Sequence, residues 1–245
     1  SPIRTGGDRA TWAAILDGSD PALLAEGYLP FEAMPQVFAP ASGFVQNAND
    51  GPSTASWPAG QVGPIDPLLT ADARTPRGRR SLRQIEDAQA LTLDGLGELR
   101  RSSVMDAAER ARLPLARAGL ASRDAELRNL GAILEAWDGS TTVDSRGSVL
   151  FADWAFRMRR ANLDINSAPI STQSPLETEA PLVDEARALN ELKASGAQLT
   201  RLFGTADVEW GTVYRIRRAG LDLPSPVGRD ELAAFLHADG ARFLP

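Results

Sequence analysis

Nucleophilic and metal-binding side chains are scarce in this sequence, and that scarcity restricts its chemistry. There is no cysteine, which excludes disulfides, thiolate metal sites and a cysteine nucleophile. The single histidine, His237, stands beside a turn at residues 238–240. A Ser-His-Asp hydrolase would have to use it, and a site with several histidine ligands cannot be built. We expect His237 to be an ordinary surface or half-buried residue.

Other sequence signatures of catalysis and ligand binding are also missing. The nucleophile elbow G-x-S-x-G, the P-loop and G-x-G-x-x-G do not occur. Asp138, Asp144 and Asp153 could suggest a cation site. However, Asp138-Gly139 and Asp144-Ser145 are typical of helix stop and start signals. The sequence therefore predicts no cofactor and no metal site.

A polar run after two apolar residues is the most distinctive short feature. Phe44 and Val45 precede Gln-Asn-Ala-Asn-Asp-Gly-Pro, a pattern that predicts a strand ending in a turn. Asn47 and Asn49 lie in that turn. Taken alone, Asn49 is most simply an asparagine that closes the turn by bonding to backbone.

Composition places the chain among ordinary globular proteins. It has 245 residues, 43% hydrophobic and 24% charged, enough for one large domain or two small ones. The net charge of −6 argues against nucleic acid or anionic lipid as a partner. No apolar stretch is long enough for a membrane span. No signal peptide opens the sequence, and Ser1 without a methionine before it suggests a processed or truncated product.

Periodicity and punctuation predict an α+β chain. Residues 1–78 are rich in turns, with an irregular proline-rich stretch at 53–78, and residues 204–245 return to strand and turn, with a strand at 208–216. The helical block of residues 79–203 is interrupted by a loop at 162–181. Its expected helices are 79–90, 93 to beyond 99 with Thr92 as cap, 104–113 before Pro114, 123–137 with Ser122 as cap, 148–159, and 182–203 with Gly196 as a weak point.

Five passages between residues 27 and 215 together resemble one family. They are GYLPFEAMPQV (27–37), SGFVQNANDGP (42–52), RSLR (80–83), AWDG with DSRGSVLF (136–139 and 144–151), and VEWGTVYR (208–215). In this order they resemble the penicillin acylase family of N-terminal nucleophile hydrolases. The similarity is greatest to the branch of acyl-homoserine-lactone and aculeacin acylases, and it covers part of the large (beta) subunit.

The resemblance implies a fold and a catalytic strategy. The expected fold is a portion of the family's four-layer αββα sandwich. In the family, the precursor cuts itself to expose a new N-terminal serine, whose own α-amine serves as base. Such a site needs no catalytic histidine, which agrees with a chain that has only one. Members of this branch keep a supporting histidine soon after the nucleophile, and this sequence has none in its first 236 residues.

The resemblance also implies site residues. Asn49 corresponds to the family's oxyanion-hole asparagine, and Asn47 is the neighbouring alternative. Ser1 is the only candidate nucleophile in the chain, but residues 1–7 predict a loop where the family nucleophile opens an apolar strand. We therefore favour a nucleophile on another chain or segment of the same precursor.

Arginines and tryptophans complete the candidate residues. The family has an arginine that braces the site near Arg74, Arg77, Arg79, Arg80 and Arg83, but the register does not identify which one. We favour the simpler interpretation of that basic run, a solvated helix start. The tryptophans are expected in the core rather than around a substrate; they are Trp12, Trp57, Trp137, Trp154 and Trp210.

The expected function is amide hydrolysis. The resemblance implies an acylase that cleaves a small-molecule amide between an acyl chain and a polar amine, such as an acyl-homoserine lactone, a lipopeptide or a β-lactam. It also implies a periplasmic or secreted bacterial protein, although the lack of cysteine fits the cytosol equally well. The alternative is a non-catalytic remnant of the fold that acts as a binding or structural module.

Overall fold

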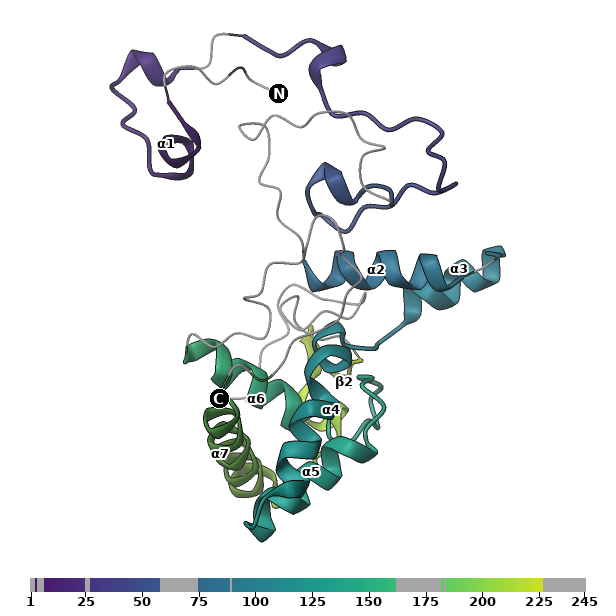
Figure 1. Cartoon of the computed structure of the whole chain (residues 1–245), viewed down its shortest axis with the longest axis vertical. Helices are drawn as coiled ribbons and strands as arrows, with labels where there is room; N and C mark the ends of the chain where they lie inside the picture. The colour runs from purple at the N-terminus through teal and green to yellow at the C-terminus, as the bar shows by residue number, and fades with distance from the viewer. Residues whose placement is uncertain are drawn as a thin grey trace. The chain divides into compact units, whose positions relative to one another are not determined.

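The computed structural model describes residues 3, 7–24, 27–57, 75–88, 90–161, 182 and 184–226 (Figure 1). The chain divides into two compact units, Ser1–Arg74 and Thr75–Pro245. The predicted loop at 162–181 lies outside the described residues, as does residue His237.

The first unit contains short turns and little regular structure. Its helix α1 spans Arg9–Ala13 and is capped by Asp8, whose carboxylate accepts a hydrogen bond from the Thr11 N–H. Single 3₁₀ turns follow at Pro21–Leu23, Phe31–Ala33 and Pro52–Thr54. The strand predicted at Phe44 and Val45 is wrong, since the described residues of this unit contain no strand.

The second unit is a helical block with a small sheet. Its helices are α2 (Pro76–Asp87), α3 (Leu93–Arg101), α4 (Asp106–Ala121), α5 (Ala125–Ala136), α6 (Ser148–Arg160), α7 (Glu185–Phe203) and α8 (Trp210–Val213). Side-chain oxygens cap four of them by accepting from backbone N–H groups of the first turn: Thr75, Thr92, Asp124 and Asp184.

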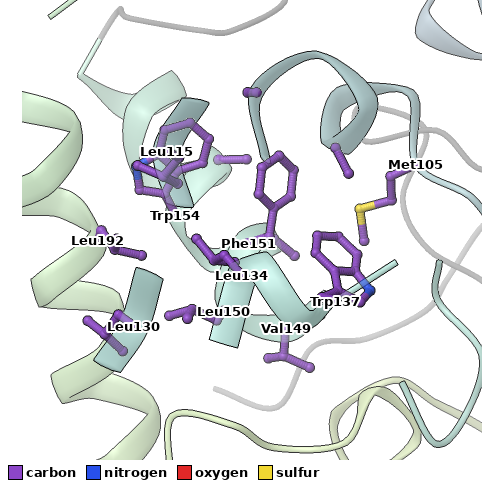
Figure 2. Packing of buried hydrophobic residues seen from close by; sticks show 14 of the residues in the cluster. Met105, Leu115, Leu130, Leu134, Trp137, Val149, Leu150, Phe151, Trp154 and Leu192 are labelled. Carbon is purple, nitrogen blue, oxygen red and sulfur yellow. The ribbon is translucent and has the colours of Figure 1, made fainter. Parts of the chain in front are cut away.

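Close helix contacts and aromatic stacking form the core of this block. Helix α4 packs on α5 where Gly119 faces Gly131, leaving no room for a Cβ atom. Figure 2 shows Trp137, Phe151 and Trp154 side by side, with ring centroids 5.4 and 5.3 Å apart. All three rings are buried. Trp137, Trp154 and Trp210 lie in the core as predicted, whereas Trp12 and Trp57 are half-buried.

The sheet is a single hairpin. Strands β1 (Arg215–Arg218) and β2 (Leu221–Pro224) pair antiparallel, with Arg215 opposite Pro224. Ala219 and Gly220 both have positive φ, as a two-residue hairpin loop with the right twist requires. Helices with one small sheet are compatible with the predicted α+β class.

Two local predictions in the helical block are corrected. Helix α4 continues through Pro114 to Ala121 instead of ending before it, because Leu115 and Ala116 are fully buried and their packing offsets the lost backbone hydrogen bond. The cap of α5 is Asp124, while the Ser122 hydroxyl accepts from the Asp124 N–H outside the helix.

Residues 208–216 do not form the continuous strand that their alternation predicts. The N–H groups of Trp210 and Gly211 donate to the carbonyls of Ser145 and Val143, which holds a helical turn at this point. That turn stacks the Trp210 ring on the ring of Tyr214, four residues later, at 3.5 Å. Of the predicted strand, Arg215 and Ile216 belong to β1.

Gly196 has a packing role that its helix propensity alone does not indicate. A Cβ atom at this position would lie 2.7 Å from the Leu130 side chain on α5. The residue predicted to be a weak point in the helix is therefore a place where α7 lies close against α5.

Candidate functional site

A closed loop carries the asparagines predicted to matter. In this loop, residues 42–57, the Gln46 N–H donates to the Ala55 carbonyl at 2.8 Å. The hydroxyl groups of Ser42 and Ser56 lie 2.6 Å apart. These two contacts join the halves of the loop, so the turn between them has a fixed base.

The tip of this loop is an asparagine turn. The Asn49 N–H donates to the side-chain oxygen of Asn47 at 2.6 Å. Asn49 has φ of 63°, in the left-handed region that asparagine tolerates better than most residues. Ala48 between them is only 3% exposed, whereas Asn47 and Asn49 are both exposed. The turn therefore anchors on Ala48 and presents the two asparagine residues outward.

The structure confirms the predicted turn but not the predicted strand before it. Val45 is 59% exposed and extended without a ladder partner among the described residues. The oxyanion role of Asn49 stays a prediction. Ser1 lies outside the described residues, so its role as nucleophile also stays a prediction.

Two of the candidate bracing arginines are tied to acidic residues on α4. Arg79 Nη2 lies 2.6 Å from Asp106 Oδ1, and both side chains are almost fully buried. The next arginine, Arg80, pairs with Glu109. These contacts hold both arginine side chains of α2 against α4. The start of α2 is therefore only partly solvated.

Burial shifts the pKa of Asp106, the acidic partner of Arg79. Desolvation raises the pKa of the Asp106 carboxyl above its ordinary value, and the Arg79 charge opposes the shift. Arg110, one turn further along α4, adds a second positive charge that also opposes it. Asp106 was not among the residues that the sequence singled out. Its position in an alanine-rich run, four residues before Arg110, was the signal available.

Two of the three aspartates considered for a cation site, Asp138 and Asp153, have structural partners. Asp138 accepts from the Ser140 N–H at 2.9 Å, and Asp153 pairs with Arg157 at 2.7 Å. Among the described residues, no group of three or more acidic, histidine or cysteine side chains is arranged to hold a metal ion. Within the same residues, no helix is long and apolar enough to cross a membrane.

A family model for penicillin amidase matches residues 1–239. The match covers nearly the whole of the 245-residue chain. The chain belongs to the penicillin amidase family.

Membership of the penicillin amidase family indicates an amide hydrolase, or acylase. Amide hydrolysis passes through a tetrahedral intermediate whose oxyanion needs fixed N–H donors. A penicillin amidase domain therefore needs a donor held in place before the reaction begins. In the described residues, the side-chain amide at the tip of the 42–57 loop has the required chemistry and a backbone that is locally constrained.

Proposed function

We propose that this chain supplies the oxyanion-stabilising part of an acylase that cleaves the amide bond between an acyl chain and a polar amine. Acyl-homoserine lactones, lipopeptides and β-lactams are the substrate classes considered. Asn49 is the proposed donor, through its side-chain N–H. The constrained turn, in which Asn49 takes a positive φ and bonds to Asn47, is the observation that carries the proposal.

We further propose that the nucleophilic serine is on another segment of the same precursor, and that the assembled fold is the family's αββα sandwich. Large apolar side chains of the first unit support this, since they are exposed where a sheet in a sandwich would be covered. They include Tyr28, Phe31, Phe38 and Val45.

The first test is the mass of the natural protein. Protein expressed from the complete coding sequence is purified, and its intact masses are measured under denaturing conditions. Two polypeptides in a fixed ratio support a processed acylase. Sequencing of both N-termini then identifies the serine. A single, uncleaved and folded polypeptide contradicts the proposal of a processed precursor.

The second test is substitution of the proposed donor. Asn49→Ala is expected to lower kcat for amide hydrolysis by about 10²–10³-fold with little change in KM, as loss of one oxyanion donor does elsewhere. Release of the free amine from one substrate of each class is the assay. Asn190→Ala is the matched control, because Asn190 is exposed on α7. Full activity in Asn49→Ala contradicts the donor role.

Absence of amine release from every substrate class, by a correctly processed and folded protein, would favour a non-catalytic binding module. We also propose a periplasmic or secreted location, in line with the family resemblance. Fractionation of the producing cells, with the protein found only in the cytosolic fraction, contradicts that location.

A further inference from the structure

The side chain of Asn47 holds the backbone of Asn49. Its N–H donates to the Asn47 carboxamide oxygen at 2.6 Å, which closes a two-residue turn. A left-handed φ of 63° is sparsely populated by residues other than glycine. The Asn47 contact therefore helps to select a backbone conformation that Asn49 would adopt less often by itself.

Backbone conformation determines where the Asn49 amide points. The side-chain rotamers open to a residue depend on its φ and ψ. If φ at Asn49 returned to the common negative region, the Cα–Cβ bond would point in another direction. Catalysis by a preorganised donor is sensitive to such changes, since misplacement by about 1 Å can cost about 10²-fold in rate.

Other contacts of the loop supply a base for the turn. Gln46 bonds to Ala55, and Ser42 to Ser56, below the tip. Ala48 is buried and anchors the middle of the turn. At the tip, the Asn47 side-chain oxygen accepts a hydrogen bond from the backbone N–H of Asn49 itself.

We propose that Asn47 is a positioning residue for the oxyanion donor Asn49. Its carboxamide oxygen holds the Asn49 N–H and so keeps the Asn49 side chain in the orientation that the tetrahedral intermediate requires. This inference rests on the proposed function, in which Asn49 is the donor. In this proposal Asn47 fixes the backbone of Asn49, and the Asn49 side chain donates to the substrate.

A double-mutant cycle on the complete protein tests the proposal. Asn47→Ala is expected to lower kcat about tenfold to 10²-fold with KM unchanged, consistent with a misplaced donor. The same substitution in an Asn49→Ala background should have no further effect on kcat, because the group that Asn47 positions is already gone. Equal losses in both backgrounds overturn the proposal, since they would show that Asn47 acts independently of Asn49.

Two further variants separate positioning from folding. Asn47→Ser keeps a neutral acceptor that can close the same turn more weakly, so it should retain more kcat than Asn47→Ala. Asn47→Gln keeps the carboxamide but changes its reach, and it should resemble Asn47→Ala. Thermal unfolding and the hydrogen exchange rate of the Asn49 amide are measured for each variant. An Asn49 amide that exchanges no faster in Asn47→Ala overturns the proposal.

The outcomes also distinguish the two asparagines. Asn47→Ala that costs more than Asn49→Ala, without recovery in Asn47→Ser, identifies Asn47 as the donor and overturns the positioning role. Asn49→Ala with full activity overturns the proposed function, and it does so in a single variant that does not involve Asn47. An inactive Asn49→Ala beside a fully active Asn47→Ala overturns only the positioning role.

Discussion

Arg79 and Asp106 form a buried ion pair that joins α2 to α4, with 2.6 Å between Arg79 Nη2 and Asp106 Oδ1. Their side chains are 1% and 0% exposed. Removing two charges from water is costly, and the attraction between them offsets that cost only while both partners remain. The arginine at this position is therefore part of the framework of the second unit.

Loss of Arg79 should destabilise the fold far more than loss of an exposed ion pair. Arg79→Met leaves the Asp106 carboxylate buried without its nearest positive charge, and we expect about 3–5 kcal/mol of destabilisation. The control is Arg101→Met, which removes an exposed pair with Glu98 and should cost about 1 kcal/mol or less. Urea unfolding followed by circular dichroism measures both changes.

The same pair can be replaced rather than broken. Arg79→Met combined with Asp106→Leu removes both charges, and the double variant should be more stable than Arg79→Met alone. A double variant that is less stable than either single variant would contradict the idea that an unpaired Asp106 carboxylate destabilises Arg79→Met.

Two aspartates should give opposite pH dependence of stability. Burial raises the pKa of Asp106, so the folded state holds this proton more tightly than the unfolded state. Its ionisation lowers the free energy of unfolding as pH rises from the ordinary aspartate pKa of about 3.9 through the raised value. Asp106→Asn should lack this decline. Urea unfolding of both proteins between pH 4 and pH 8 measures the difference.

Asp124 should behave in the opposite way. Hydrogen bonds from the Lys193 ammonium group and the Glu126 N–H lower the pKa of its carboxyl. The stability that ionised Asp124 contributes is present above its ordinary pKa and is lost as pH falls through the lowered value. Asp124→Asn keeps an oxygen to cap α5 but has no charge. Its thermal midpoint should therefore vary less than that of the native protein below pH 4.

Local signals in the sequence predicted most of the helical block. The helix predicted at 123–137 is α5, and Leu127, Leu130 and Leu134, spaced along one of its faces, are all buried. Thr92 was predicted as a cap, and its hydroxyl accepts from the Gly95 N–H. These features depend on contacts within a few residues, which a single sequence contains in full.

Features that depend on distant contacts were missed or wrong. Pro114 was taken to end a helix, but burial of its neighbours sustains α4 beyond it. Trp210 was placed in a strand, but its N–H bonds to the Ser145 carbonyl far earlier in the chain. Asp106 was not noticed, because its importance arises only when α2 brings Arg79 beside it.

In the candidate site, too, the sequence predicts the local features but not those that depend on distant contacts. Asparagine, aspartate and glycine after Val45 predicted the turn at Asn49, and the structure confirms it. The strand expected before this turn requires a neighbouring strand, and propensity at Phe44 and Val45 cannot provide one. The tasks of Asn47 and Asn49 could not be separated from sequence, because only geometry shows which oxygen accepts from which N–H.

Glycine-to-alanine substitutions in two helices should change stability in opposite directions. A Cβ atom at Gly131 would lie 2.8 Å from the backbone oxygen of Ala116 and 2.8 Å from the backbone nitrogen of Leu120. Helices α4 and α5 would have to separate, so Gly131→Ala should cost about 1–3 kcal/mol. At Gly97 in α3 the nearest atoms belong to the flexible end of the Arg101 side chain, at 3.3 Å.

Gly97→Ala should therefore stabilise the protein by up to about 1 kcal/mol, because alanine has the higher helix propensity and the Arg101 side chain can move aside. Urea midpoints of the two variants and the native protein are compared at one pH. A common shift in the same direction would mean that helix propensity or a change in the unfolded state dominates both positions. Opposite shifts would mean that the backbone contact at Gly131 sets the separation of α4 and α5, because the same substitution is favourable in a helix without that contact.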